Sequence, residues 1–266
     1  MSLSQRVSFN PQLRNYLMGA IYLAFTGYSL YQMAQTPQIE GKICYLIIIV
    51  VFLGIALWSE YLRHLYKKAI FTLNIEGKPE EAKTQFDDLM KKDIFHGYRK
   101  NRLIFDTLYY TDQMQPMECM NTLEKDSKFF HNSMDNLLIW DYTKFYSYFL
   151  LNNRTKTKQQ YERVMKLKDV KIKGTKISPL YNWEFIEAIY LFSCKDYKKS
   201  LKAFQNVNPK NMNHRELMHY YYQFAQLYFA INDIINANNY LDKVIALGGD
   251  SVMMQKAKEE RNKYLK

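Results

Sequence analysis

The chain has 266 residues and a formal net charge of +11. Hydrophobic residues make up 48% of it, and it contains only 9 glycines and 6 prolines. This composition excludes collagen-like, low-complexity and disordered proteins, and the scarcity of helix-breaking residues favours an all-α fold. The three cysteines, Cys44, Cys119 and Cys194, have neither a paired nor a metal-ligand spacing, so we predict no disulfide and no zinc module.

Two uncharged stretches near the amino end predict a transmembrane helical hairpin. The first runs from Asn15 to Ile39, and the second lies between Lys42 and Glu60. Both approach the roughly 20 apolar residues that a helix needs to cross a bilayer. Polar residues such as Thr26 interrupt the first stretch, whereas the second is almost wholly apolar. The expected spans are residues 15–35 and 42–60.

Basic residues lie on both flanks of this hairpin and hardly at all in its loop. Two precede the first span and three follow the second, whereas Thr36–Lys42 holds a single lysine. The positive-inside rule then places both termini in the cytoplasm, in a multi-pass protein of the cell membrane. A cleaved signal peptide is the alternative for the first stretch, but Tyr31–Ala34 fits a cleavage site poorly. We expect residues 1–62 to form the anchor and residues 63–266 a cytoplasmic domain.

The join between these parts has few helix breakers. From Lys42 to Asn74 there is no proline, and the only glycine is Gly54. We therefore expect one continuous helix to run from the second span into the cytoplasmic domain, and to hold that domain rigidly beneath the bilayer.

The cytoplasmic domain shows an internal period. Five times, a helical stretch and a turn are followed by a helix that opens with a small or polar residue and carries an apolar one four positions later. The five recurrences predict about five helix pairs. We expect these pairs to stack, because a single pair of this length cannot bury its apolar stripe alone. The five residue pairs are Ala82/Phe86, Cys119/Leu123, Gln160/Val164, Ser200/Phe204 and Ala237/Leu241.

These units resemble tetratricopeptide (TPR) repeats, most closely from about residue 182 onward. The last unit places large, small and aromatic residues as the family does, at Tyr221, Phe224, Ala225, Tyr228, Ala237, Leu241 and Val244. Earlier units depart from the pattern: Gln160 replaces the usual alanine, Asp126 stands at an apolar position, and the period exceeds the family's roughly 34 residues. The resemblance implies an α-solenoid whose first helices line a concave groove for a protein or peptide partner.

The register of the resemblance assigns an aromatic lining to that groove. Such a surface suits a hydrophobic peptide or an amphipathic helix. The alternative is that these side chains pack against neighbouring helices, as aromatic residues at helical spacing commonly do. The expected groove residues are Tyr142, Phe145, Phe149, Phe185, Ile189, Phe192, Tyr222 and Phe229, with Asn182, His219 and Gln226 in the same register.

A basic segment lies between residues 154 and 176. It holds nine lysines and arginines against only Glu162 and Asp169. The anionic headgroups of a cytoplasmic leaflet attract such a segment, although a solvated surface without a special role is the alternative. The basic residues are Arg154, Lys156, Lys158, Arg163, Lys166, Lys168, Lys171, Lys173 and Lys176.

No catalytic pattern is present, so we expect neither an enzyme nor a cofactor. His214 and His219 are five residues apart, which does not place them on one helix face as i, i+4 metal ligands. The sequence predicts a membrane-anchored bacterial adaptor that binds a protein partner at the inner face of the membrane. Two alternatives stay open: a regulatory or immunity-type protein that acts through its hairpin, and a basic nucleic-acid-binding repeat protein, for which no recognition motif is present.

Overall fold

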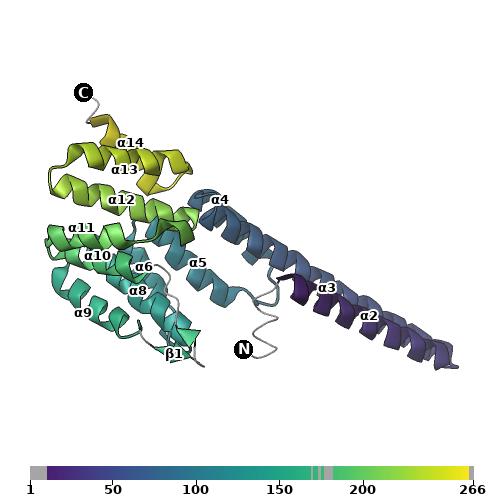
Figure 1. Cartoon of the computed structure of the whole chain (residues 1–266). Helices are drawn as coiled ribbons and strands as arrows, with labels where there is room; N and C mark the ends of the chain where they lie inside the picture. The colour runs from purple at the N-terminus through teal and green to yellow at the C-terminus, as the bar shows by residue number, and fades with distance from the viewer. Residues whose placement is uncertain (1–10, 169, 173–174, 177–181, 264–266) are drawn as a thin grey trace. The chain divides into compact units, whose positions relative to one another are not determined.

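The computed structural model describes residues 11–168, 170–172, 175–176 and 182–263, and helices account for most of them. Within this part of the chain the only strands are the two-residue pieces β1 (Lys171–Ile172) and β2 (Thr175–Lys176), which pair with each other. The expected all-α fold is therefore confirmed in outline (Figure 1). The chain divides into two units, Met1–His64 and Leu65–Lys266, within a few residues of the boundary expected from the sequence.

The first unit contains α2 (Pro11–Gln35) and most of α3 (Ile39–Asn74). The two helices contact each other through aromatic rings. Phe25 and Tyr22 of α2 lie against Phe52 of α3, with ring centroids 3.9 Å and 6.0 Å apart. Most large apolar side chains of this unit, by contrast, are exposed. As expected from the lack of proline, α3 continues without interruption to Asn74.

One helix of the described residues, α3, is long and apolar enough to cross a membrane. Only 11% of its most apolar stretch is buried inside the protein, so that surface is left for another medium to cover. The helix α2 does not reach the same combination of length and hydropathy, because Asn15, Thr26 and Gln32 lower its apolar content. The second span and the orientation of the termini stay predictions.

The second unit is built from the end of α3 and eleven further α-helices within the described residues. Consecutive helices pack in pairs, most extensively α5 with α6, α8 with α9, α10 with α11 and α12 with α13. The bounds are α4 (Pro79–Lys92), α5 (Arg99–Asp112), α6 (Pro116–Glu124), α7 (Ser127–Phe130), α8 (Met134–Leu150), α9 (Arg154–Met165), α10 (Trp183–Ser193), α11 (Tyr197–Asn206), α12 (His214–Ala230), α13 (Ile234–Leu247) and α14 (Val252–Lys263), with a 3₁₀ turn at Pro209–Asn211.

The same short turn recurs five times in this unit, between the two helices of each pair. Each turn contains one residue with a positive φ, which reverses the chain, and the second helix begins two residues later. In three of the five turns the intervening residue, such as Asp196, caps the second helix by accepting a hydrogen bond from a backbone N–H. The positive-φ residues are Gly77, Met114, Asn152, Lys195 and Asn232.

The residue pairs that carry the sequence period lie in the core. Of the ten residues, nine are buried, and only Gln160 is partly exposed. They fall on α4, α6, α9, α11 and α13, which are the second helices of the five pairs. The departure at Asp126 also has a local reason: its side chain accepts a hydrogen bond from the backbone N–H of Phe129 and caps α7, a short helix that the sequence pattern did not predict.

The first and last helix pairs of this unit meet each other. The backbone N–H of Asp250 donates to the carbonyl oxygen of Gly77 at 3.2 Å, and the His214 ring of α12 comes within 2.6 Å of the position that a Cβ atom at Gly77 would occupy. In an open repeat array each pair contacts only its neighbours. This unit differs from that arrangement, because the α13–α14 turn packs against the turn that precedes α4.

Candidate functional site

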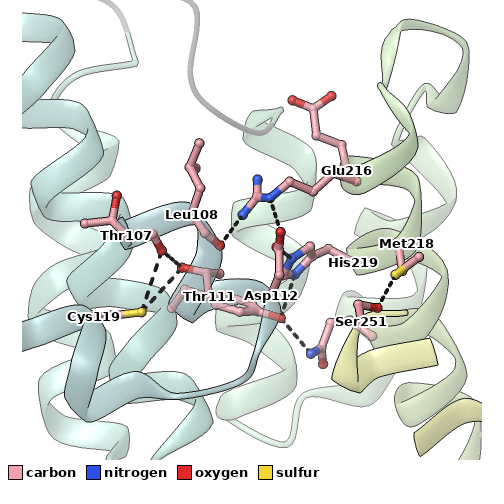
Figure 2. Close-up of polar contacts among 12 residues, drawn as sticks. Thr107, Leu108, Thr111, Asp112, Cys119, Glu216, Met218, His219 and Ser251 are labelled. Carbon is pink, nitrogen blue, oxygen red and sulfur yellow. Dashed lines mark hydrogen bonds and ion pairs between the residues drawn. The ribbon is translucent and has the colours of Figure 1, made fainter. Parts of the chain in front are cut away.

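A buried polar cluster joins α5 to α12 in the interior of the second unit (Figure 2). The carboxylate of Asp112, at the end of α5, accepts hydrogen bonds from the Arg215 guanidinium and the His219 ring, both at 2.7 Å. All three side chains are almost completely buried. Arg215 also donates to the backbone carbonyl of Leu108 at 3.4 Å. A buried charge is tolerated only when it is paired and hydrogen-bonded, and this geometry meets both conditions.

The cluster continues from His219 to α8 and back to α12. The Tyr146 hydroxyl lies 3.2 Å from His219 Nδ1 and accepts a hydrogen bond from the Gln223 amide at 2.8 Å. Burial lowers the pKa of His219, although the adjacent Asp112 acts in the opposite direction. The neutral imidazole then donates from Nε2 to Asp112 and accepts from Tyr146 at Nδ1. Every partner in the chain of hydrogen bonds is satisfied in this protonation state.

The space beside this cluster is small. The adjoining cavity measures about 10 Å³ and is lined by Leu73, Asp112 and His219 among others, which is room for about one water molecule. Close to it, burial raises the pKa of the Cys119 thiol to about 11, so this cysteine is not an activated nucleophile. Among the described residues, no group of three or more His, Cys, Asp or Glu side chains could hold a metal ion. The cluster stabilises the interior.

Five of the eight expected groove residues are in the core, which corrects the prediction for those positions. Their side chains pack between helices and therefore do not line an open groove. The physical reason is that the space between the helices is filled by the aromatic rings of the core and by the Asp112 cluster, which joins α5, α8 and α12. The buried residues are Tyr142, Phe145, Phe185, Ile189 and Tyr222, each at most 4% exposed. His219, from the same register, is completely buried, and Asn182 caps α10.

The other three expected groove residues, Phe149, Phe192 and Phe229, are only partly buried. The rings of Phe149 and Phe192 lie 5.9 Å apart and form one wall of a pocket of about 450 Å³. This pocket, hereafter the turn pocket, opens at the α8–α9 and α10–α11 turns. It is lined by Phe149, Asn152, Arg154, Thr157, Phe192, Ser193, Lys195 and Tyr197. A shallower hollow of about 190 Å³ shares three of these residues and extends toward Gln226 on α12.

The turn pocket combines aromatic rings with positive charge. Arg154 donates from Nε to the carbonyl oxygen of Ser193 at 2.8 Å, which fixes its guanidinium at the rim. Lys195 is exposed in the turn, where its φ of 61° directs the chain into α11. No acidic residue is among those that line the pocket. It is therefore suited to an apolar side chain accompanied by a carboxylate.

The basic segment is placed on the surface as far as the structure describes it. Arg154, Lys156, Lys158, Arg163 and Lys166 are exposed, and Lys168 is partly buried. Two of these cations are paired: Arg163 lies 3.3 Å from Asp141, and Lys158 lies 4.0 Å from Glu162. Lys173, and the side chains of Lys171 and Lys176, lie outside the described residues. Arg154 is shared with the turn pocket, so the two features adjoin.

Sequence reasoning missed five of the eight residues that line the turn pocket. Two of them, Thr157 and Ser193, belong to α9 and α10; the other three are Asn152, Lys195 and Tyr197. The groove register counts positions along the first helix of each pair, whereas these three residues belong to the turns and the start of α11. The signal that could have located them is the recurrence of a helix-capping Asn or Asp after the turn, at Asn153 and Asp196.

Comparisons with known proteins add no relative. No family model, no curated protein and no solved structure matches the chain. The resemblance to TPR repeats therefore depends on the residues and turns of this chain alone.

Proposed function

We propose that this protein is a membrane-anchored adaptor whose second unit binds a peptide segment of a partner protein in the turn pocket. The observation that carries the proposal is the combination found there: partly exposed Phe149 and Phe192 rings with Arg154 and Lys195 at the rim, in a pocket of about 450 Å³. Pockets of roughly this size, with apolar walls and a few polar groups, are typical ligand sites. The second unit is, in this proposal, a TPR-like helical-repeat domain of five pairs.

The chemistry of the pocket defines the partner segment. An aromatic or aliphatic side chain would pack against the wall formed by the two phenylalanine rings, and an adjacent carboxylate would face the two cations. Arg154 is held by its hydrogen bond to Ser193, so little side-chain entropy would be lost when it binds a carboxylate. The proposed anchor is α3, with α2 as a second span, which would place this pocket at the inner face of the membrane. No enzymatic activity is part of this proposal.

Site-specific photo-cross-linking in intact cells tests the proposal. A photoreactive amino acid at Tyr197, on the pocket wall, is expected to give one discrete cross-linked product. The same amino acid at Ile235, which is 78% exposed on α13, serves as the control and is expected to give none. Substitution of both Arg154 and Lys195 by glutamate should reduce the Tyr197 product several-fold. Equal amounts of product from Tyr197 and Ile235 would refute the turn pocket as the binding site. The photoreactive amino acid is also placed at positions in α2, and products obtained only from these would favour the alternative in which the hairpin acts.

A further inference from the structure

The loop between α4 and α5 exposes two adjacent large apolar side chains. Ile94 is 70% exposed and Phe95 is 71% exposed, although most large apolar residues of the second unit are at least partly buried. They lie between the first and second helix pairs and are not part of the turn pocket. A pair of neighbouring exposed apolar residues at a loop tip is unfavourable in water, so the feature calls for an apolar medium that covers it.

This loop has a defined conformation. The Asp93 side chain is buried, and its two oxygens accept hydrogen bonds from the backbone N–H groups of Gly97 at 3.0 Å and Tyr98 at 2.7 Å. His96 adopts a φ of 56°, which completes the reversal of the chain. The two apolar side chains are thus presented by a loop that is already ordered, so little conformational entropy would be lost when they bind.

Positive charges surround the same loop. Residues 91–100 carry four cations and a single carboxylate, Asp93, which is occupied by the backbone N–H groups described above. Beside the loop is a pocket of about 410 Å³ whose lining has four cations against two carboxylates. The cations of the loop are Lys91, Lys92, Arg99 and Lys100, and those of the pocket are Arg99, Lys100, Arg102 and Lys125. Four carboxylates pair with cations of the loop or pocket: Asp88 with Lys91, Asp87 and Asp106 with Arg102, and Asp126 with Lys100.

We infer that the Ile94–Phe95 tip inserts into the surface of an anionic bilayer. The two apolar side chains would enter the boundary between headgroups and acyl chains, while the flanking cations contact lipid phosphates. Charge complementarity selects a lipid surface over an apolar protein groove, because the four cations lie on both sides of the tip in the sequence. The inference draws on the proposed function for one thing only: a membrane anchor in the same chain makes this second contact intramolecular, so weak binding suffices.

The test measures the depth of a spin label on the full chain in vesicles. Phe95 and, as the control, Ile235 are replaced singly by cysteine and labelled with a nitroxide. The exposed Cys44 and Cys194 are changed to serine, and the buried Cys119 is kept. In vesicles of phosphatidylglycerol and phosphatidylcholine, the label at 95 is expected to be more accessible to oxygen than to a water-soluble nickel complex. The label at 235 should show the reverse.

Two changes should return the label at 95 to water: vesicles of phosphatidylcholine alone, and substitution of Lys91, Lys92, Arg99 and Lys100 by glutamate. A label at 95 that is water-accessible in both vesicle compositions would overturn the inference. So would a label that is shielded equally in vesicles and in detergent, which would indicate a protein surface as the cover. Extraction of the full chain with alkaline carbonate tests the anchor separately, since loss of the tip contact by Phe95→Asp should leave the chain in the membrane fraction.

Discussion

Asp112 is the residue on which the interior of the second unit depends most. Its carboxylate neutralises the buried Arg215 and fixes the His219 ring, and it lies more than 100 positions from both in the sequence. Exposed pairs such as Lys199 with Asp196, at 2.8 Å, have similar geometry but are surrounded by water. Burial, more than distance, therefore sets the energetic importance of an ion pair in this protein.

We expect Asp112→Ala to lower the free energy of unfolding by about 3 to 5 kcal/mol, because it removes the carboxylate that neutralises the buried Arg215 charge. For a domain of this size that is roughly 10 °C in the thermal midpoint. Calorimetry of the full chain in detergent measures it, with Lys199→Ala as the control that should change the midpoint little. The double variant Asp112→Leu/Arg215→Met should recover part of the loss, since both charges are removed together. Equal midpoints for Asp112→Ala and Lys199→Ala would contradict the role of Asp112.

His219 makes stability depend on pH near neutrality. Burial lowers the pKa of His219 in the folded protein, while an unfolded histidine titrates near 6.5. Below about pH 6.5 protons therefore bind the unfolded chain preferentially, so the stability is complete above this pH and declines as the pH falls toward the folded pKa. The thermal midpoint should drop between pH 7.5 and pH 5.5, and the drop should be smaller in His219→Gln. The groups that face the ring, Asp112, Arg215 and Tyr146, are unchanged in that comparison. Parallel pH profiles of the two proteins would refute this assignment.

At the scale of elements, the turns decide how the helices meet. Gly249 has a φ of 93°, and a Cβ atom there would lie 2.2 Å from the carbonyl oxygen of Gly77. Gly248, its neighbour, also has a positive φ, but a Cβ atom there would meet nothing within 4 Å. A substitution at Gly248 therefore tests backbone strain alone, whereas one at Gly249 tests strain together with the close approach of the α13–α14 turn to Gly77.

We expect Gly248→Ala to cost about 1 kcal/mol, from the strained φ alone. Gly249→Ala should cost more, by about 1 to 3 kcal/mol, because the backbone at Gly77 must also shift. Thermal unfolding of both variants in the same detergent measures the difference. If the two substitutions prove equally costly, the contact between the α13–α14 turn and Gly77 does not contribute to stability.

Much of the element structure follows from the sequence because it is local. The i, i+4 spacing of a small or polar residue with an apolar one, as at Ala237/Leu241, identifies the second helix of each pair, and burial confirms these positions as core. Two features do not follow from local spacing. One is α7, which forms because Asp126 caps it; the other is the contact between Asp250 and Gly77, which joins residues far apart in the chain.

The site was less predictable than the helices, for a related reason. Periodicity identifies which side of a helix is apolar, and it does so correctly for Phe145 and Phe185. It does not reveal whether that side faces an open groove or another helix, since this depends on how tightly the first helices pack. The turn pocket is formed where two turns adjoin, so Phe149 and Phe192 were identified from the register while Lys195 was not.

At the scale of the whole molecule, the predicted orientation can be tested with the native cysteines. Cys194 is exposed in the second unit, which we expect in the cytoplasm. A membrane-impermeant maleimide should therefore label it only after the cells are permeabilised. In a Cys44→Ser background, a Gln38→Cys variant, in the predicted outer loop, should be labelled in intact cells. Labelling of Cys194 from outside intact cells would refute the topology.

The contact between the first and last helix pairs also fixes how long this domain can be. An open repeat array can gain or lose a pair by duplication or deletion, because only the neighbouring interfaces change. Here an added pair would separate Asp250 from Gly77 and Arg215 from Asp112, and so break both links at once. The number of pairs is therefore constrained as it is in a closed ring, and its evolution should proceed by substitution within the five pairs and not by growth of the array.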